Sequence, residues 1–210
     1  MFREWQFAGR LALLFANYHR HTYCGCKPAM TDIFMGATAL AAEYNGVSKA
    51  PHIQQDLAEL IILAELVYAA GIASAFKGQI TSSGICEPAA LYSNMGRYLA
   101  GKNIYHEYEV LAATAGGLPA SLPYEQDWLN PETSPYLEKY IMRNPNVSPE
   151  NQYRLFRFIS DYSCSAWAGA IQYGGIHGGG SPIMEQIGIR SGYDLESKKQ
   201  IVKYLAGIED

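Results

Sequence analysis

Apolar side chains in this chain recur every three or four positions, and almost none alternate with a period of two. The first spacing places side chains on one face of a helix, whereas the second would favour a strand. In residues 51–77 the apolar positions at helical spacing are Ile53, Leu57, Leu60, Ile61, Ala64, Val67 and Phe76. Pro51 stands near the first turn of this run, where its missing N–H is tolerated. The pattern predicts one long helix here and gives no support for a sheet.

Pro, Gly and Ser residues mark the ends of further helices along the 210 residues. We expect these helices at about 2–23, 28–45, 87–117 and 148–174, followed by one that begins near Ser181-Pro182. A passage rich in Pro, Glu and Asn at 118–135 is typical of an irregular surface loop. The elements predict a single all-α domain over residues 1–210, an antiparallel four-helix bundle with shorter helices at its ends.

Composition narrows the possible partners and the compartment. Only 17% of residues are charged and the net charge is −4, so no basic surface for nucleic acid is expected. Glu59 and Glu65 interrupt the most apolar stretch, 57–76, which argues against a membrane span. The four cysteines do not form a dense disulfide framework in a chain this long, which favours the reducing cytoplasm. Cys86 and Cys164 have apolar neighbours and are expected to be buried thiols.

Two of the longest expected helices are apolar around much of their circumference. Helices of this kind are buried on more than one side. The small residues of GATALAA and YAAGIASA would also let neighbouring helices approach closely. We therefore expect subunit contacts and a homo-oligomer.

The stretch NYHRHTYCGCKP at 17–28 gathers unusual chemistry into twelve positions. If one helix continues through it, His19, Tyr23 and Cys26 fall at i, i+4 and i+7 on one face and form a shared site. Gly25 and Pro28 favour a break just before Cys26, which would still let the three groups converge. In the structural alternative the histidines cap carbonyl groups, the tyrosine packs and the cysteines are inert. No second Cys/His pair is present for a zinc module, but the stretch could be half of a site completed by another domain or chain.

The segment QYGGIHGGGSPIMEQ at 172–186 ends one expected helix and begins another. Its glycines would let the backbone approach a ligand, and the N-terminus of the second helix favours an anion. No strand precedes it, so it is not a dinucleotide fingerprint, and a hinge between helices is the alternative. Glu185 would complement the dipole of the second helix. Asn94 and Arg97 either reach a cofactor phosphate or ribose or lie on a solvated helix face.

The chain carries three segments that together resemble the C-terminal half of a flavoprotein family: HRHTYCGCKPAMTDIFMGATALAAEYNG, GRYLAGKNIYHEYE and GGIHGGGSPIMEQI. This family includes 4-hydroxyphenylacetate 3-hydroxylases and 4-hydroxybutyryl-CoA dehydratases, and the most specific motif is His-x3-Tyr-x2-Cys-Lys. The resemblance implies a helical bundle of the acyl-CoA dehydrogenase C-terminal type. For the dehydratase branch it implies that His19 and Cys26 bind a [4Fe–4S] cluster, with Tyr23 and Lys27 beside them as catalytic residues.

The same resemblance implies an FAD site and a substrate-facing acid. Gln172, Gly174 and Gly175 match the segment through which acyl-CoA dehydrogenases meet the flavin of a neighbouring subunit. Asn94 and Arg97 are further candidates for contact with the cofactor. Glu185 falls where the family carries an acid near the substrate.

The implied activity is dehydration of 4-hydroxybutyryl-CoA to crotonyl-CoA, with vinylacetyl-CoA isomerisation, by a cytoplasmic homotetramer. A base such as His19 or Glu185 would take a proton, and Tyr23 would position or protonate the leaving hydroxyl. The family's other two cluster cysteines and most of its flavin pocket are expected from an N-terminal region or companion subunit, without which the chain is predicted to be inactive. Two alternatives remain open, an FAD-dependent aromatic hydroxylase domain and a catalytically silent helical assembly module.

Overall fold

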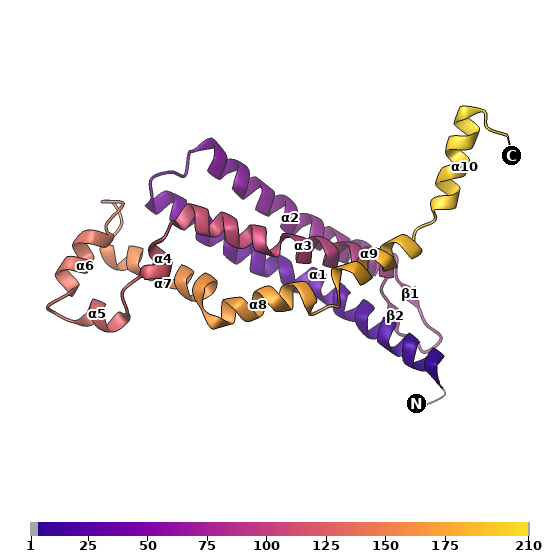
Figure 1. The fold of residues 1–210 in the computed structure, drawn as a ribbon, viewed down its shortest axis with the longest axis horizontal. Coiled ribbons are helices and arrows are strands. Elements are labelled where there is room, and N and C mark those ends of the chain that lie inside the picture. The colour runs from indigo at the N-terminus through magenta and orange to yellow at the C-terminus, as the bar shows by residue number, and fades with distance from the viewer. Residues whose placement is uncertain (1–3, 210) are drawn as a thin grey trace.

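The computed structural model describes residues 4–209 and confirms the all-α helical bundle (Figure 1). Three long helices form its body: α1 (Trp5–Tyr44), α2 (Pro51–Phe76) and α3 (Ala90–Ala115). Each of the three packs against the other two, while α7 (Pro149–Cys164) lies along α1 and α3 and α8 (Ala166–His177) lies along α3. Within residues 4–209 the only strands are those of a short hairpin, β1 (Gln79–Ile80) and β2 (Cys86–Glu87).

Shorter helices occupy the two ends of the bundle. The passage at 118–135 was expected to be an irregular loop, and this is corrected by α4 (Leu118–Ser121), α5 (Glu125–Leu129) and the start of α6 (Ser134–Ile141). A reciprocal capping box between Tyr124 and Asp127 explains how so short a helix as α5 forms. At the other end α9 (Pro182–Ser191) packs on α3, and α10 (Leu195–Ala206) projects away from the bundle (Figure 1).

Helix α1 is continuous, so the predicted break before Cys26 is wrong. It includes Gly25 and carries Pro28 in its interior. A proline there removes one backbone hydrogen bond and costs about 3 kcal/mol. Packing on α2 and α3 outweighs this cost because buried side chains lie on both sides of the proline, including Cys24, Lys27 and Thr31. The stripe of His19, Tyr23 and Cys26 therefore exists as one helical face.

The predicted helix over 148–174 is two helices. Ser165 has an extended backbone, and its hydroxyl accepts a hydrogen bond from the N–H of Ala168, so it ends α7 and caps α8. Helix α8 then continues to His177, which makes Gly174 and Gly175 helical residues. The glycine-rich segment is thus part helix, and Ser181 caps α9 as predicted.

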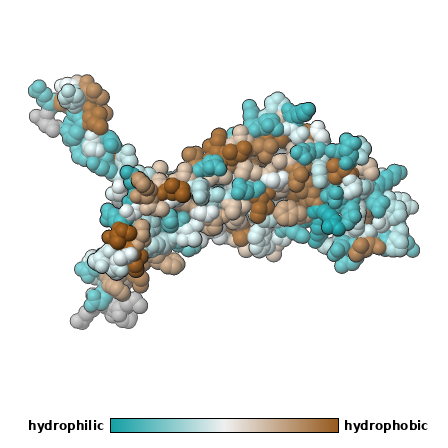
Figure 2. All heavy atoms as spheres, turned by 180° about the vertical axis from the view of Figure 1, so that it is seen from behind, coloured by the Kyte–Doolittle hydropathy of each residue, from teal (hydrophilic) through white to brown (hydrophobic). Residues whose placement is uncertain are grey.

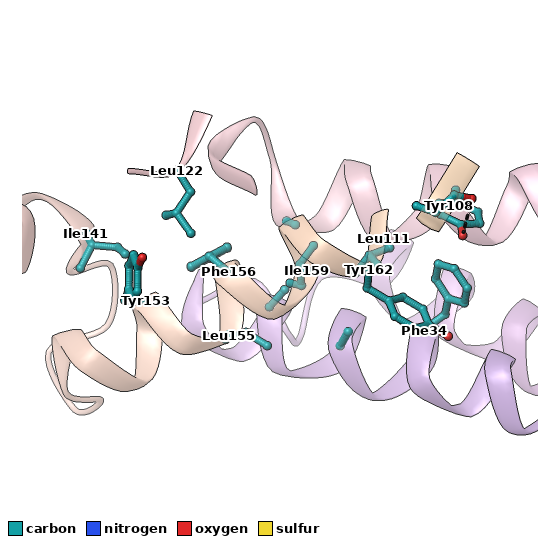
Figure 3. Packing of buried hydrophobic residues seen from close by; sticks show 14 of the residues in the cluster. Phe34, Tyr108, Leu111, Leu122, Ile141, Tyr153, Leu155, Phe156, Ile159 and Tyr162 are labelled. Atoms are coloured by element: carbon teal, nitrogen blue, oxygen red, sulfur yellow. Dashed lines mark hydrogen bonds between the residues drawn. The ribbon is translucent and has the colours of Figure 1, made fainter. Parts of the chain in front are cut away.

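The apolar core lies where α1, α3 and α7 meet (Figure 3). Phe34 points from α1 toward the rings of Tyr108 and Tyr162, whose centroids lie 4.7 and 5.0 Å away in edge-on arrangements. Phe156 and Ile159 extend this core along α7 toward the end formed by α4 and α6. Burial of each such side chain stabilises the fold by about 1.5–3 kcal/mol.

The α1–α3 contact changes character along its length. Beyond Thr31 its buried side chains are apolar except for Thr38 and Thr114, but the half nearer the N-terminus of α1 buries a seam of polar and charged side chains. We call this set the polar seam: Asn17, Arg20, Lys27 and Thr31 of α1 with Ser93, Asn94, Arg97 and Glu107 of α3. Buried polar groups are costly unless they are paired, so their partners decide what this half of the bundle does.

Close helix packing holds the polar seam together around Cys24, which is fully buried. A Cβ added at Gly96 would lie 2.5 Å from its sulfur, and one added at Gly71 would lie 3.0 Å from its Cβ. Burial raises the pKa of the Cys24 thiol to about 11, so this cysteine is a packing residue at ordinary pH. Cys86 and Cys164 are exposed, which corrects the prediction that both are buried: they lie in the hairpin and at the end of α7.

Helix α2 has two apolar faces. One packs on α1 and α3 through Leu60, Ala64 and Val67, and the other is exposed, with Ile61, Ile62, Leu66, Tyr68, Ile72 and Phe76. Figure 2 shows hydrophobic atoms gathered along the edge of the bundle formed by α2. By length and composition alone α2 is apolar enough to cross a membrane, a test that core helices also pass. Its outer face suits a protein contact, as the homo-oligomer prediction requires.

Candidate functional site

The continuous α1 sets His19, Tyr23 and Cys26 on one stripe, two helical turns or about 10.5 Å from end to end. His19 Nδ1 is buried and has no hydrogen-bond partner among the described residues. The Cys26 side chain is exposed, and its sulfur lies 3.7 Å from the carbonyl oxygen of Tyr23. An imidazole nitrogen and a cysteine sulfur are both donors found in iron–sulfur sites. The two side chains therefore suit such a cluster by their chemistry, and their role as its ligands stays a prediction.

The residues described, 4–209, do not bring together the ligands of a complete metal centre. Within residues 4–209 no group of three His, Cys, Asp or Glu residues is placed to hold a metal ion. Cys24, the nearest other cysteine, is buried and directs its sulfur at the carbonyl oxygens of Arg20 and Ser93. A metal centre bound by His19 and Cys26 would need ligands beyond these two residues.

Tyr23 stands at the centre of the stripe, facing α3 and α8. The guanidinium carbon of Arg97 lies 4.4 Å from the centroid of its ring, in cation–π geometry. Burial raises the pKa of Tyr23 to about 12, although the Arg97 charge opposes this rise. A Cβ added at Gly175 would lie 3.4 Å from the phenol oxygen, so the backbone of α8 closes over that group. Tyr23 is thus a protonated phenol that can donate a hydrogen bond near neutral pH.

Glu185 lies fully buried in the first turn of α9. Its Oε1 is 3.8 Å from Nε of Arg97 and 4.0 Å from Nε of Arg20. Neither carboxylate oxygen has a hydrogen-bond partner among the described residues. Burial raises the pKa of Glu185, while the two guanidinium groups lower it. Such a carboxyl group is suited to accept and hold a proton.

Arg20 fixes the glycine-rich segment to α3, and sequence reasoning missed it. Its Nε donates to the carbonyl oxygen of Gly179 at 2.8 Å, and its Nη1 donates to Oδ1 of Asn94 at 2.6 Å. The Asn94 amide is therefore engaged inside the chain, and its contact with a cofactor stays a prediction. The missed signal was a charged residue three positions before Tyr23, on the side of α1 that packs inward.

Lys27 follows Tyr23 by one turn of α1, and its side chain is buried against α3. Its Nζ donates to Oγ1 of Thr31 at 2.9 Å and to Oε1 of Glu107 at 2.5 Å, and it also contacts the second Glu107 oxygen. Burial lowers the pKa of Lys27 and raises that of Glu107, and their mutual attraction opposes both shifts. Because the Lys27 nitrogen contacts both carboxylate oxygens of Glu107, the two side chains form an ion pair of an ammonium and a carboxylate.

Glu107 was the second residue that sequence reasoning missed. The neighbouring His106 does not pair with Glu107: its imidazole lies 2.9 Å from Oε2 of Glu59 and 3.7 Å from Oε2 of Glu109. The available signal was spacing, because Arg97 and Glu107 fall on the same face of α3 as buried Ala100 and Ile104. Charges at such positions indicate buried partners.

The three residues predicted to meet a flavin lie along α8 but not on one face. Gln172 lies near the hydroxyl of Tyr108, and Gly175 is buried against Ile104 of α3. Gly174 is exposed on another side of the helix. Exposure of Gly174 leaves backbone accessible at this point, and flavin contact at these three positions stays a prediction.

This arrangement, a helical bundle with a buried polar cluster beside a His/Cys stripe, belongs to a known family. The chain matches the family described as 4-hydroxyphenylacetate 3-hydroxylase C terminal over residues 8–207, and it is a member of that family. It is 33% identical, over 99% of its length, to 4-hydroxybutyryl-CoA dehydratase/vinylacetyl-CoA-Δ-isomerase of Clostridium aminobutyricum.

Solved structures show the same fold. An oxygen-tolerant archaeal 4-hydroxybutyryl-CoA dehydratase from N. maritimus matches 99% of the chain with a TM-score of 0.91 and 35% identity. The oxygenase component of a 4-hydroxyphenylacetate 3-monooxygenase, solved with FAD and 4-hydroxyphenylacetate, matches 90% of it with a TM-score of 0.82 and 23% identity. The chain spans 44% of the clostridial relative and 41% of the archaeal one.

Proposed function

We propose that the chain is the C-terminal part of a hydro-lyase that dehydrates 4-hydroxybutyryl-CoA to crotonyl-CoA, with vinylacetyl-CoA isomerisation. The observation that carries the proposal is the His19, Tyr23 and Cys26 stripe beside the buried Glu185. The stripe and Glu185 together provide potential metal ligands, a phenol and a carboxyl group, and the last two can act as the acid and the base in elimination of water. Similarity to two dehydratases over 99% of the chain supports this reading.

His19 and Cys26 would hold one edge of a [4Fe–4S] cluster, and two further ligands would come from another region or a companion subunit. FAD would lie along Gln172, Gly174 and Gly175. When bound, these groups would supply one-electron chemistry and a Lewis acid for the leaving hydroxyl. Acyl-CoA would be the substrate, and the exposed face of α2 would contribute to a homotetramer in the cytoplasm.

The chain's own residues would move the protons. Glu185, whose pKa is raised by burial, would take a proton from the acyl chain, with His19 as the other candidate base. Tyr23 would donate a hydrogen bond, or its proton, to the hydroxyl that leaves as water. Lys27, held by Glu107, would keep a positive charge beside the stripe. Loss of a C3 hydrogen and the C4 hydroxyl as water would give vinylacetyl-CoA, and transfer of a proton from C2 to C4 would then give crotonyl-CoA.

A second function has support of its own. The relative solved with FAD and 4-hydroxyphenylacetate shares the fold, so an FAD-dependent aromatic hydroxylase domain is the alternative enzyme. It would need no iron and would leave His19 and Cys26 without a role. A silent assembly module is the third candidate, supported by the exposed apolar face of α2 and the incomplete ligand set.

Anaerobic production of the chain together with the region that completes the protein tests these proposals. We expect bound iron, sulfide and flavin, together with water elimination from 4-hydroxybutyryl-CoA. Bound flavin without iron, with hydroxylation of a phenol, would favour the hydroxylase. Neither cofactor and no activity, with a stable oligomer by light scattering, would favour the assembly module.

A further inference from the structure

Arg97 occupies an unusual position in the polar seam. Its side chain is completely buried, yet Nε, Nη1 and Nη2 have no hydrogen-bond partner within residues 4–209. A guanidinium carries five N–H donors, and burying them unpaired is expensive. The two groups that Arg97 does approach are the ring of Tyr23, at 4.4 Å, and the carboxylate of Glu185, at 3.8 Å. It touches both predicted acid/base residues, which come from different helices.

Glycines hold the Arg97 guanidinium in place. A Cβ added at Gly101 would lie 2.6 Å from its Nη1, and one added at Gly179 would lie 2.7 Å from its Nε. A Cβ at Gly180, where φ is +103°, would lie 2.9 Å from Nη2 of Arg20. Part of the glycine-rich segment is thus explained without any ligand, because larger residues there would displace the two arginines.

Arg20 does not share this role. It is fixed by its hydrogen bonds to Gly179 and Asn94, and its Nε is slightly farther from Glu185, at 4.0 Å. Together the two guanidinium groups and the single carboxylate leave this cluster with one excess positive charge. Arg97 is the member that places this charge against the ring of Tyr23.

We propose that Arg97 is a positioning residue that holds the Tyr23 ring and the Glu185 carboxylate in one buried cluster, so that both face the same substrate. The proposal rests on the proposed function for the identity of that substrate. The Arg97 charge also lowers the pKa values of Tyr23 and Glu185 against the effect of burial. Without it the phenol would be a weaker acid and the carboxyl group a weaker source of negative charge.

Replacement of Arg97 in the completed, cofactor-loaded protein tests this proposal. Arg97→Met removes the charge and the planar group, while Arg97→Lys keeps the charge. Arg190→Met is the matched control, because Arg190 is an exposed residue on the same helix as Glu185. We expect Arg97→Met to lower kcat by about 10–100-fold through misplaced reacting groups, with KM, iron and flavin near wild-type values. The kcat of Arg97→Lys should lie between those of Arg97→Met and the wild type. The kcat of Arg190→Met should match that of the wild type.

Two readouts separate positioning from a purely structural role. The acid limb of the pH–rate profile should move to higher pH in Arg97→Met, because Glu185 loses a nearby positive charge. A single 3-fluorotyrosine at position 23 should give a fluorine resonance that shifts in Arg97→Met and not in Arg190→Met. If Arg97→Met does not fold, a lowered kcat with a shifted resonance in Arg97→Lys supports the proposal.

A wild-type kcat together with an unmoved resonance in either Arg97 variant overturns it. So does a loss of kcat that only follows loss of iron or flavin. If the wild-type protein eliminates no water, the proposed function fails, and the fluorine resonance alone then decides whether Arg97 holds Tyr23. The two failures are therefore distinguishable.

Discussion

Removing either partner of the Lys27–Glu107 ion pair should destabilise the fold, with opposite dependence on pH. Lys27 is 1% exposed and Glu107 is completely buried, so each charge depends on the other and on Thr31 for its solvation. A partner left alone can lose its charge instead of remaining ionised. The destabilisation therefore cannot exceed the free energy needed to neutralise the remaining side chain at pH 7.

That limit differs between the two variants. In Glu107→Gln, Lys27 must give up a proton that it holds with an ordinary pKa of 10.5, which costs at most about 5 kcal/mol at pH 7. In Lys27→Met, Glu107 must take up a proton against an ordinary pKa of 4.5, which costs at most about 3 kcal/mol. The double variant Lys27→Met/Glu107→Leu removes both charges and should approach wild-type stability.

The signs follow from proton linkage. In Glu107→Gln the unfolded chain binds one more proton than the folded chain below pH 10.5, so stability rises by up to about 1.4 kcal/mol per pH unit. In Lys27→Met the folded chain keeps a proton that the unfolded chain releases above pH 4.5, so stability falls as pH rises. Urea unfolding followed by circular dichroism between pH 6 and 9 measures both slopes.

Glu109→Gln is the control, because it makes the same chemical change on α3 at an exposed carboxylate. It should alter the free energy of unfolding by less than about 1 kcal/mol at every pH. Parallel pH slopes in Glu107→Gln and Lys27→Met, or a double variant less stable than either single one, would show that the two side chains do not form an isolated buried ion pair.

Three further predictions follow from the site and its packing. Cys26→Ala should lose iron but keep flavin, and full iron content would end the cluster assignment. Tyr23→Phe and Glu185→Gln should keep both cofactors yet lose about 10²–10⁴-fold in dehydration rate, measured by crotonyl-CoA formation. Gly96→Ala should destabilise the fold by about 1–3 kcal/mol in thermal or urea unfolding, since its Cβ would lie 2.5 Å from a buried sulfur. Gly25→Ala is its control, because a Cβ added there has no neighbouring atom within 4 Å. This variant should raise the free energy of unfolding by about 1 kcal/mol through helix propensity.

The local sequence pattern was sufficient to predict most helices, but it did not predict where helix α1 continues or where α7 ends. Periodic apolar residues and a proline at the first turn located α2, and Ser181 with Pro182 located α9. The continuity of α1 through Pro28 could not be predicted in this way, because contacts with helices far along the chain decide it. The break at Ser165 carried a capping signal that the apolar residues on both sides obscured.

Site residues that lie close together in the sequence could be predicted. Contacts between residues far apart in the sequence could not. His19, Tyr23 and Cys26 share one stripe by spacing alone once α1 is continuous. Glu107 lies 80 positions from Lys27, and Gly179 lies 159 positions from Arg20. No local pattern contains such pairings, which only the packing of α1, α3 and the glycine-rich segment creates.

The polar seam explains why chemistry is concentrated at this end of the bundle. Helices α1 and α3 form an apolar contact around Phe34, Leu111 and Ala115. Packing of these two helices therefore does not by itself require the charged residues of the polar seam. Buried charges add less stability than well-packed apolar residues would, and each needs a partner to be tolerated. The ion pairs Lys27–Glu107 and Arg97–Glu185 therefore concentrate the cost of buried charge in the part of the bundle that contains Tyr23. This part of the bundle adjoins the stripe of His19, Tyr23 and Cys26, which is why a functional role accounts for the polar seam better than stability does.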